Sequence, residues 1–102
     1  ITANLEDFMQ VTNFLLKDKG KMYMVHRPER LVDIMQLMRK YKLEPKRIRF
    51  VYPSINKEPN LVLISGVKNA RPFLKIDKPL VVYENGKYTD EILKIYNKTS
   101  DL

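Results

Sequence analysis

The sequence predicts a small α/β protein with a mixed β-sheet and flanking helices. Short apolar runs at 22–25 and 61–64 have the length of strands, and segments at 5–16 and 31–41 repeat apolar residues at helical spacing. A helix between the first two predicted strands favours parallel strands, whereas the short polar loop before the third favours an antiparallel neighbour. With 102 residues, of which 44% are hydrophobic, the chain can form one core.

The spacing of apolar residues predicts two helices in the first half, over about 4–18 and about 28–41. Asn4 can cap the first helix and Gly20 can end it. Pro28 suits the first turn of the second helix. The apolar sides of the two helices are formed by Leu5, Phe8, Met9, Thr12, Leu15 and Leu16, and by Leu31, Ile34, Met35, Met38 and Tyr41.

Three main strands are predicted. The runs at 22–25 and 61–64 are continuously apolar, which is typical of strands that are covered on both faces. The segment at 47–52 alternates between polar and apolar residues and therefore predicts a half-exposed strand, which Pro45 separates from the preceding helix. The strand that begins at 61 is expected to end near Gly66.

The last third of the chain predicts smaller elements. Residues 69–79 form a basic, irregular connection, and residues 80–83 form a short extended piece. Asn85-Gly86 is a turn signal. Thr89 can cap a short helix, with acidic residues at its positive end. The apolar side of that helix is formed by Ile92, Leu93, Ile95 and Tyr96.

These elements predict a partial domain. Two of the three main strands require cover on both faces, yet the chain supplies few helices. The sequence also begins Ile-Thr-Ala-Asn, without an initiator Met. We therefore expect residues 1–102 to form a single partial domain, cut from a longer protein.

The charge favours an anionic partner. The formal net charge is +7, and residues 17–49 alone hold eleven basic and four acidic side chains. Nucleic acid is the commonest partner of such a basic surface. The alternative is a solvated, lysine-rich surface without a ligand.

Several kinds of chemistry are excluded by composition. The chain has no cysteine, so it has no disulfide, thiolate metal site or cysteine nucleophile, in agreement with a cytoplasmic location. His26 is the only histidine, so no histidine metal cluster can form. No apolar run approaches the ~20 residues of a membrane span, and no signal peptide pattern occurs. No Gly-rich phosphate loop occurs, and we assign no catalytic, cofactor-binding or metal-binding residue.

The remaining candidate site is the segment His26-Arg27-Pro28-Glu29-Arg30, which follows the carboxyl end of the predicted strand at 22–25. Ligands bind at this edge of open α/β sheets. Arg27 and Arg30 could contact phosphates or stack on a base, and His26 could donate a hydrogen bond. The structural alternative is that Glu29 and Arg30 pair on the helix and that His26 is satisfied internally.

A second basic cluster follows, at the end of the helix and the start of the next strand. Its position predicts the opposite edge of the sheet, where it could steer a long polyanion or serve only solubility. It comprises Arg39, Lys40, Lys42, Lys46, Arg47 and Arg49.

The segment MYMVHRPERLVDIMQLMRKYKLEPKRIRFVYP resembles the C-terminal half of Rossmann-like bacterial methyltransferases that use S-adenosylmethionine. It is most similar to the family that methylates an adenine of a valine tRNA beside the anticodon. The Leu5-Glu6-Asp7, PNLVLISG and PLVVY segments and the helix start at Tyr88-Thr89 continue the resemblance, which covers nearly the whole chain in order.

The resemblance implies a specific sheet. Lys21–His26 would be its fifth strand and Lys46–Tyr52 its sixth, with Leu61–Val67 an antiparallel strand inserted between them. The family's cofactor loop and its Asn-Pro-Pro-Tyr motif, which holds a flipped adenine, belong to the other half and do not occur in this sequence. We therefore expect the parent protein to transfer a methyl group to the exocyclic amine of adenine in tRNA, and this chain alone to be inactive.

The resemblance also implies candidate contacts to tRNA or substrate at the carboxyl edge of the sheet. They are His26, Arg27 and Arg30 after the first strand, and Tyr52, Pro53 and Lys57 after the second. Two other functions remain open. One is a non-catalytic basic module that binds RNA, and the other is a methyltransferase of the same fold with another substrate. An unpaired edge at 22–25 further predicts self-association.

Overall fold

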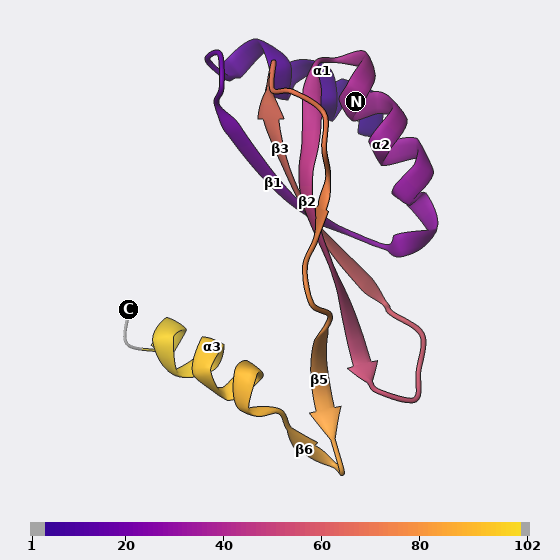
Figure 1. Ribbon diagram of the computed structural model, residues 1–102, viewed down its shortest axis with the longest axis vertical. Helices are drawn as coiled ribbons and strands as arrows, with labels where there is room; N and C mark the ends of the chain where they lie inside the picture. Colours follow the sequence, from indigo (N-terminus) through magenta and orange to yellow (C-terminus); the bar gives the residue numbers. More distant parts are fainter. Residues whose placement is uncertain (1–3, 101–102) are drawn as a thin grey trace.

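The computed structural model describes the backbone of residues 4–100 and the side chains of residues 4–98. One sheet contains β1 (Lys21–His26), β2 (Leu43–Ser54), β3 (Leu61–Lys68), β4 (Lys75–Ile76), β5 (Leu80–Glu84) and β6 (Lys87–Tyr88). The helices are α1 (Leu5–Leu15), α2 (Leu31–Lys40) and α3 (Asp90–Ser100), and a 3-10 turn at Pro28–Arg30 leads into α2 (Figure 1). None of the described helices is long and apolar enough to cross a membrane.

The strand order confirms the mixed sheet. It runs β1-β3-β2-β5-β6, with β4 also paired to β2. β3 is antiparallel to both β1 and β2, so β1 and β2 are parallel to each other although they are not neighbours. This three-stranded centre, two parallel strands with an antiparallel strand inserted, is the arrangement that the resemblance implied.

Helix α1 begins and ends for local reasons. The Asp7 backbone N–H donates to the Asn4 side chain at 2.8 Å, and the Asn4 backbone N–H donates to the Asp7 carboxylate at 3.2 Å, which forms a capping box. The helix ends at Leu15, three residues before the predicted end, because the backbone of Leu16 is already extended. Lys19, rather than Gly20, takes the left-handed conformation there, with φ of 64°.

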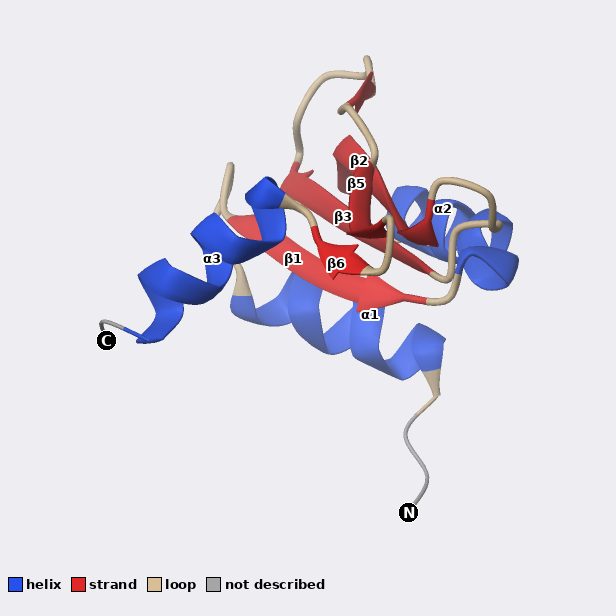
Figure 2. Cartoon of the chain, turned by 90° about the horizontal axis from the view of Figure 1, so that it is seen from below, coloured by secondary structure: helices blue, strands red, loops and turns tan. Residues whose placement is uncertain are grey.

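The core lies on one face of the sheet. Helices α1 and α2 pack there, and each strand of the centre contributes the residues that point toward them. The buried cluster consists of Met9 from α1, Ile34 and Met38 from α2, Met22 from β1, Leu43 and Ile48 from β2, and Val62 and Ile64 from β3. Figure 2 shows α1 below the strands and α3 apart from the other two helices.

The prediction that β1 is covered on both faces is wrong for the described chain. Alternate residues of a strand point to opposite faces, and Tyr23 and Val25 are 73% and 59% exposed. Helices α1 and α2 pack on the other side, and Glu91 of α3 pairs with Arg49 on this side. We call this side of β1, β3 and β2 the open face. The apolar run in β1 therefore gives the strand apolar side chains on both faces, and the described chain buries only one of these faces.

Strand β2 is longer than predicted. It begins at Leu43 and continues through Pro45, which was expected to lie outside it. Pro45 is tolerated because the register with β3 shifts between Pro45 and Arg47, which leaves Lys46 as the extra residue of a bulge. The bulge directs the Lys46 side chain toward the connection at 69–79. There its Nζ donates to the carbonyl oxygens of Arg71 and Pro72.

The C-terminal elements extend the sheet beyond β2. β5 is parallel to β2, and β6 turns back on β5 through Asn85 and Gly86. Both turn residues have positive φ, 52° and 77°, as a type I′ turn requires. The stacked rings of Tyr83 and Tyr88, 4.7 Å apart, close this hairpin. The irregular connection at 69–79 also contains β4, which is parallel to β2.

Candidate functional site

The carboxyl ends of β1 and β2 carry the residues that the sequence singled out. β1 ends at His26, and the 3-10 turn that begins at Pro28 directs the chain into α2. His26 lies opposite Val62 of β3, which in turn lies opposite Phe50 of β2. His26 therefore belongs to the row of side chains on the helix-covered side of the sheet and is half-buried there.

A hydrogen bond to the His26 ring indicates which of its two ring nitrogens is left for a ligand. The Arg27 backbone N–H donates to Nδ1 of His26 at 2.8 Å. In the neutral ring this leaves the hydrogen on Nε2. Nε2 is then the ring nitrogen that could donate to a ligand.

The two arginines of this segment differ. Arg27 is exposed and forms no ion pair with any described residue. Arg30 pairs with Asp33, with 3.0 Å between Nε and Oδ2, and not with Glu29 as the structural alternative had it. Both members of that pair are more than half exposed, so the pair contributes little stability and leaves Arg30 open to exchange.

Tyr52, Pro53 and Lys57 lie at the same end of the sheet but farther along it. Tyr52 is two residues beyond Phe50, which is level with His26, so it stands about 7 Å further along the strand direction. Tyr52 and Pro53 are half-buried, and Lys57 is exposed on the loop between β2 and β3. Within residues 4–98, no hydrogen bond or ion pair joins these three to His26, Arg27 or Arg30. The structure thus places the six residues at one end of the sheet, without a hydrogen bond or ion pair between the two groups of three among the described residues.

The second basic cluster is largely neutralised. Arg39 pairs with Glu44, and Lys40 pairs with Glu6. Arg47 pairs with Asp77, and Arg49 with Glu91. These contacts fasten α1 to α2 and the C-terminal elements to β2. Most of this cluster therefore serves the fold, and only Lys42, exposed with φ of 59°, keeps a charge without a hydrogen bond or ion pair from its side chain to another described residue.

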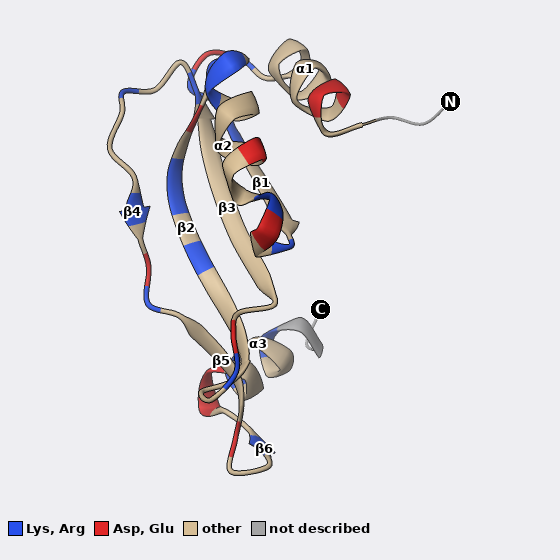
Figure 3. Ribbon diagram, turned by 90° about the vertical axis from the view of Figure 1, so that its right-hand side faces the viewer, with Lys and Arg blue, Asp and Glu red and all other residues tan. Residues whose placement is uncertain are grey.

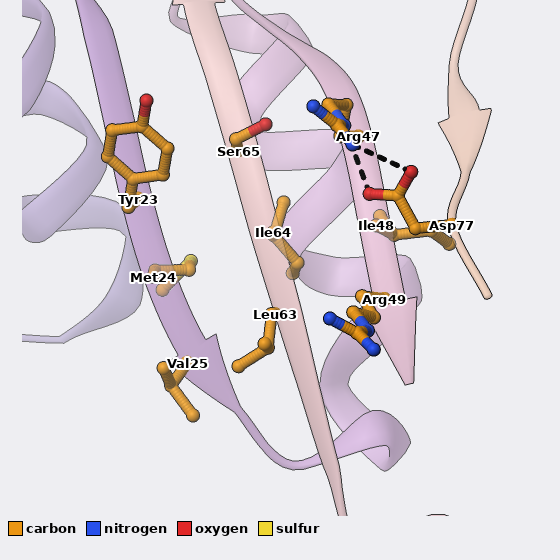
Figure 4. A pocket seen from close by; sticks show the side chains of 10 residues that line it. All are labelled: Tyr23, Met24, Val25, Arg47, Ile48, Arg49, Leu63, Ile64, Ser65 and Asp77. Carbon is orange, nitrogen blue, oxygen red and sulfur yellow. Dashed lines mark hydrogen bonds and ion pairs between the residues drawn. The ribbon is translucent and has the colours of Figure 1, made fainter. Parts of the chain in front are cut away.

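The sequence did not predict the groove on the open face. Tyr23, Val25, Leu63 and Ser65 line it together with the Arg47–Asp77 pair (Figure 4). The hydrogen bond from Arg47 holds the pKa of the Asp77 carboxyl below its ordinary value, and Asp77 raises the pKa of the Arg47 guanidinium. A carboxylate and a guanidinium that satisfy each other in this way are a structural pair and not an acid–base couple. Asp77 escaped prediction because its partner is 30 residues away.

No group of three or more potential metal ligands occurs among the described residues. No protein-family model matches the chain. No curated protein matches its sequence. Its structure is similar to that of a predicted O-methyltransferase from Agrobacterium tumefaciens, with a TM-score of 0.83 and 19% sequence identity. The similarity covers 91% of this chain and 45% of that protein. The chain therefore has the fold of part of a methyltransferase and spans just under half the length of that protein.

Proposed function

We propose that the chain is part of an S-adenosylmethionine-dependent methyltransferase that acts in the cytoplasm on the exocyclic amine of an adenine in tRNA. The position of β3 carries the proposal. A strand inserted between two parallel strands and antiparallel to both is what the resemblance to the tRNA adenine methyltransferases implied. The fold shared with a predicted O-methyltransferase supports the same class of enzyme.

The open face supports the proposal that more protein completes the domain. Its apolar side chains, Tyr23 and Val25 among them, lie on the side of the sheet that α1 and α2 leave uncovered. A contiguous exposed apolar patch is typical of a surface that other protein covers. The remaining 55% of a protein such as the similar O-methyltransferase would supply enough chain to cover it.

We assign no site for S-adenosylmethionine to the residues of this chain. A cofactor that the backbone must approach closely needs glycine at the loop that holds it, and the chain has three glycines. Gly20 precedes β1, Gly66 lies within β3, and Gly86 is in the β5–β6 turn. None lies at the carboxyl end of β1 or β2, so we derive no methyl-transfer step from this chain.

The role left for this chain is to hold the RNA. Arg27 has no ion-pair partner among the described residues and can bind a phosphate or stack on a base. Arg30 can exchange Asp33 for a phosphate, and Nε2 of His26 can donate to an acceptor on the RNA. Tyr52, Pro53 and Lys57 would extend this contact along the β2–β3 loop, with Lys57 as a second phosphate ligand.

The test compares the protein made from the complete reading frame with the 102-residue chain. Each is incubated with S-adenosylmethionine and unmodified tRNA, and the digested nucleosides are analysed by mass spectrometry for methyladenosine. We expect methyladenosine with the complete protein only, and no S-adenosylmethionine binding by the chain alone in calorimetry. If the complete protein instead transfers the methyl group to ribosomal RNA, to a protein or to a small molecule, the proposed tRNA substrate is wrong. Micromolar cofactor binding by the chain alone would contradict the proposed division of the domain.

The second candidate, a non-catalytic RNA-binding module, is favoured by the unpaired Arg27 and the net charge of +7. It predicts salt-dependent RNA binding by the chain alone together with no methyl transfer by the complete protein. If the folded chain does not bind RNA at low salt, the protein is not an RNA-binding module.

A further inference from the structure

We propose that Phe73, with Arg71 and Lys75 on either side, forms a stacking site for an unpaired base of RNA. The site deepens the proposed function and rests on it, because it gives the same RNA a second contact, between α2 and the connection at 69–79. Phe73 is 86% exposed, the highest value of any large hydrophobic side chain in the described part of the chain. An exposed aromatic ring between cations is the arrangement that single-stranded nucleic acid recognises.

The backbone of Phe73 is strained. Its φ of 102° lies in a region that residues with a bulky side chain rarely adopt. Such a conformation costs free energy and persists only where the surroundings hold it. Here the surrounding contacts hold a backbone conformation in which the aromatic ring of Phe73 stays in solvent. The ring therefore gains no free energy from burial.

Three contacts hold the segment in place. Nζ of Lys46, the bulged residue of β2, donates to the carbonyl oxygens of Arg71 and Pro72 at 2.9 and 3.3 Å. The β4 strand that follows Phe73 pairs with β2 at Arg47 and Ile48. The Asp77 backbone N–H then donates to the Ile48 carbonyl oxygen at 2.9 Å. The ring is therefore presented by an anchored segment and not by a loose loop.

The charges around the ring are available. Arg71, Lys75 and Lys78 are exposed and form no ion pair with any described residue. Figure 3 shows basic residues on both sides of β4 along this connection. This differs from the second basic cluster, whose arginines are paired with carboxylates. A polyanion can therefore bind along the connection at 69–79.

A groove beside the ring can receive a base. Phe73 and Leu74 form one side of it, and Leu31, Val32 and Met35 of α2 form the other, around a volume of about 820 Å³. Gln36 also lines the groove, and its amide can donate to and accept from the edge of a base. An apolar groove with a few polar groups is typical of ligand sites.

Nucleic acid fits this segment better than a membrane surface does. In helices that lie on membranes, the apolar and basic residues form separate faces. Between Arg71 and Lys78, basic residues stand on both sides of the apolar run Pro72–Leu74 in one extended segment, as phosphates flank the bases of a single strand. The groove beside Phe73 also reaches Leu31, the residue after Arg30, so one RNA strand can contact both sites.

The test uses fluorescence anisotropy of the 102-residue chain with labelled tRNA transcript and labelled single-stranded RNA at low salt. We expect Phe73→Leu to weaken binding at least about fivefold, since base stacking on one ring contributes that much or more. Arg71→Gln and Lys75→Gln should each lower the slope of binding against salt by about one. Phe14→Leu is the matched control, because Phe14 is 85% exposed on α1. Bromouridine-substituted RNA should cross-link to the peptide that contains Phe73.

The outcomes separate this inference from the proposed function. Unchanged RNA binding by Phe73→Leu, with binding lost on Arg27→Gln, would overturn the stacking site and leave the proposed function standing. Binding of phosphatidylglycerol vesicles that depends on Phe73, without RNA binding, would overturn it in favour of a membrane contact. Binding and cross-linking at Phe73, with no methyl transfer by the complete protein, would support the site and count against the proposed function.

Discussion

Arg47 on β2 and Asp77 after β4 form a two-point ion pair, with Nε 3.0 Å from Oδ2 and Nη2 2.9 Å from Oδ1. The pair joins the centre of the sheet to the connection at 69–79 across 30 residues of sequence. It also occupies the polar side of the groove on the open face. The charge that the sequence assigned to a polyanion surface is thus used to fasten the connection to β2.

This pair predicts a pH dependence of stability. The hydrogen bond from Arg47 lowers the pKa of Asp77 below its ordinary value of 3.8, so the folded state prefers the ionised carboxylate. The stabilisation is therefore present above the ordinary pKa and is lost as the pH falls through the lowered pKa. We expect Asp77→Asn to lower the midpoint of urea unfolding slightly at pH 7 and to leave it unchanged in strongly acidic solution. An equal loss at both pH values would show that the ion pair is not the cause.

Gly66 predicts a packing defect on substitution. A Cβ at this position would lie 2.4 Å from Cε of the fully buried Met38, and 3.3 Å from both Cγ of Met22 and the Glu44 carbonyl oxygen. We expect Gly66→Ala to lower the free energy of unfolding by about 1–3 kcal/mol, as overpacking of a core does.

Chemical denaturation tests this expectation. Ser65→Ala, at the next position on the opposite side of β3, is the control and should change the free energy of unfolding by less than about 0.5 kcal/mol. Met38→Leu removes the crowded atom and should reduce the cost of Gly66→Ala. If the two changes are simply additive, Met38 is not the source of the strain.

The unpaired edge of β1 predicts self-association of the chain. β1 is the terminal strand of the sheet, and Tyr23 and Val25 expose apolar surface beside its free backbone groups. We expect concentration-dependent dimers in sedimentation velocity, and we expect Val25→Lys to shift them to monomers, since lysine blocks the pairing of edge strands. Ile55→Lys, on the loop between β2 and β3, is the control with a similar exposure. A wild-type chain that stays monomeric at every concentration would refute the prediction.

Arg27 predicts a phosphate contact at the carboxyl end of β1. Because its guanidinium has no ion-pair partner among the described residues, Arg27→Gln removes a charge without breaking an internal contact. We expect weaker RNA binding with a salt slope lower by about one and an unchanged thermal unfolding midpoint. Lys87→Gln, on the β5–β6 hairpin, should leave RNA binding unchanged. Equal effects of the two substitutions would indicate a non-specific response to net charge.

Local patterns in the sequence predicted most elements of the fold. The cap at Asn4, the turn at Asn85-Gly86 and the apolar repeats of α1 and α2 depend on neighbours within a few residues, so the sequence contains the information for them. The predicted boundaries of α1 and β2 were wrong where the backbone departs from regular geometry. Pro45 was expected to exclude a strand, but a bulge accommodates it. Leu16 leaves the helix although its side chain fits the apolar repeat.

The candidate site was predicted only in outline. The sequence placed His26 and Arg27 at the carboxyl end of a strand, because they follow an apolar run and precede the proline that begins a helix. It could not tell which arginines are free. Arg47 and Arg27 look alike in the sequence, but Arg47 is paired with Asp77, whereas Arg27 has no ion-pair partner in the described part of the chain.

The sequence by itself determined the class of fold, the helices and strands and the excess of positive charge, because these depend on composition and short-range periodicity. Only the tertiary structure decided that one face of β1 stays open and that Phe73 stands exposed between cations without an ion-pair partner among the described residues. The physical reason is that pairing between strands and between charges joins residues far apart in the chain. Such partners are selected by the geometry of the whole sheet.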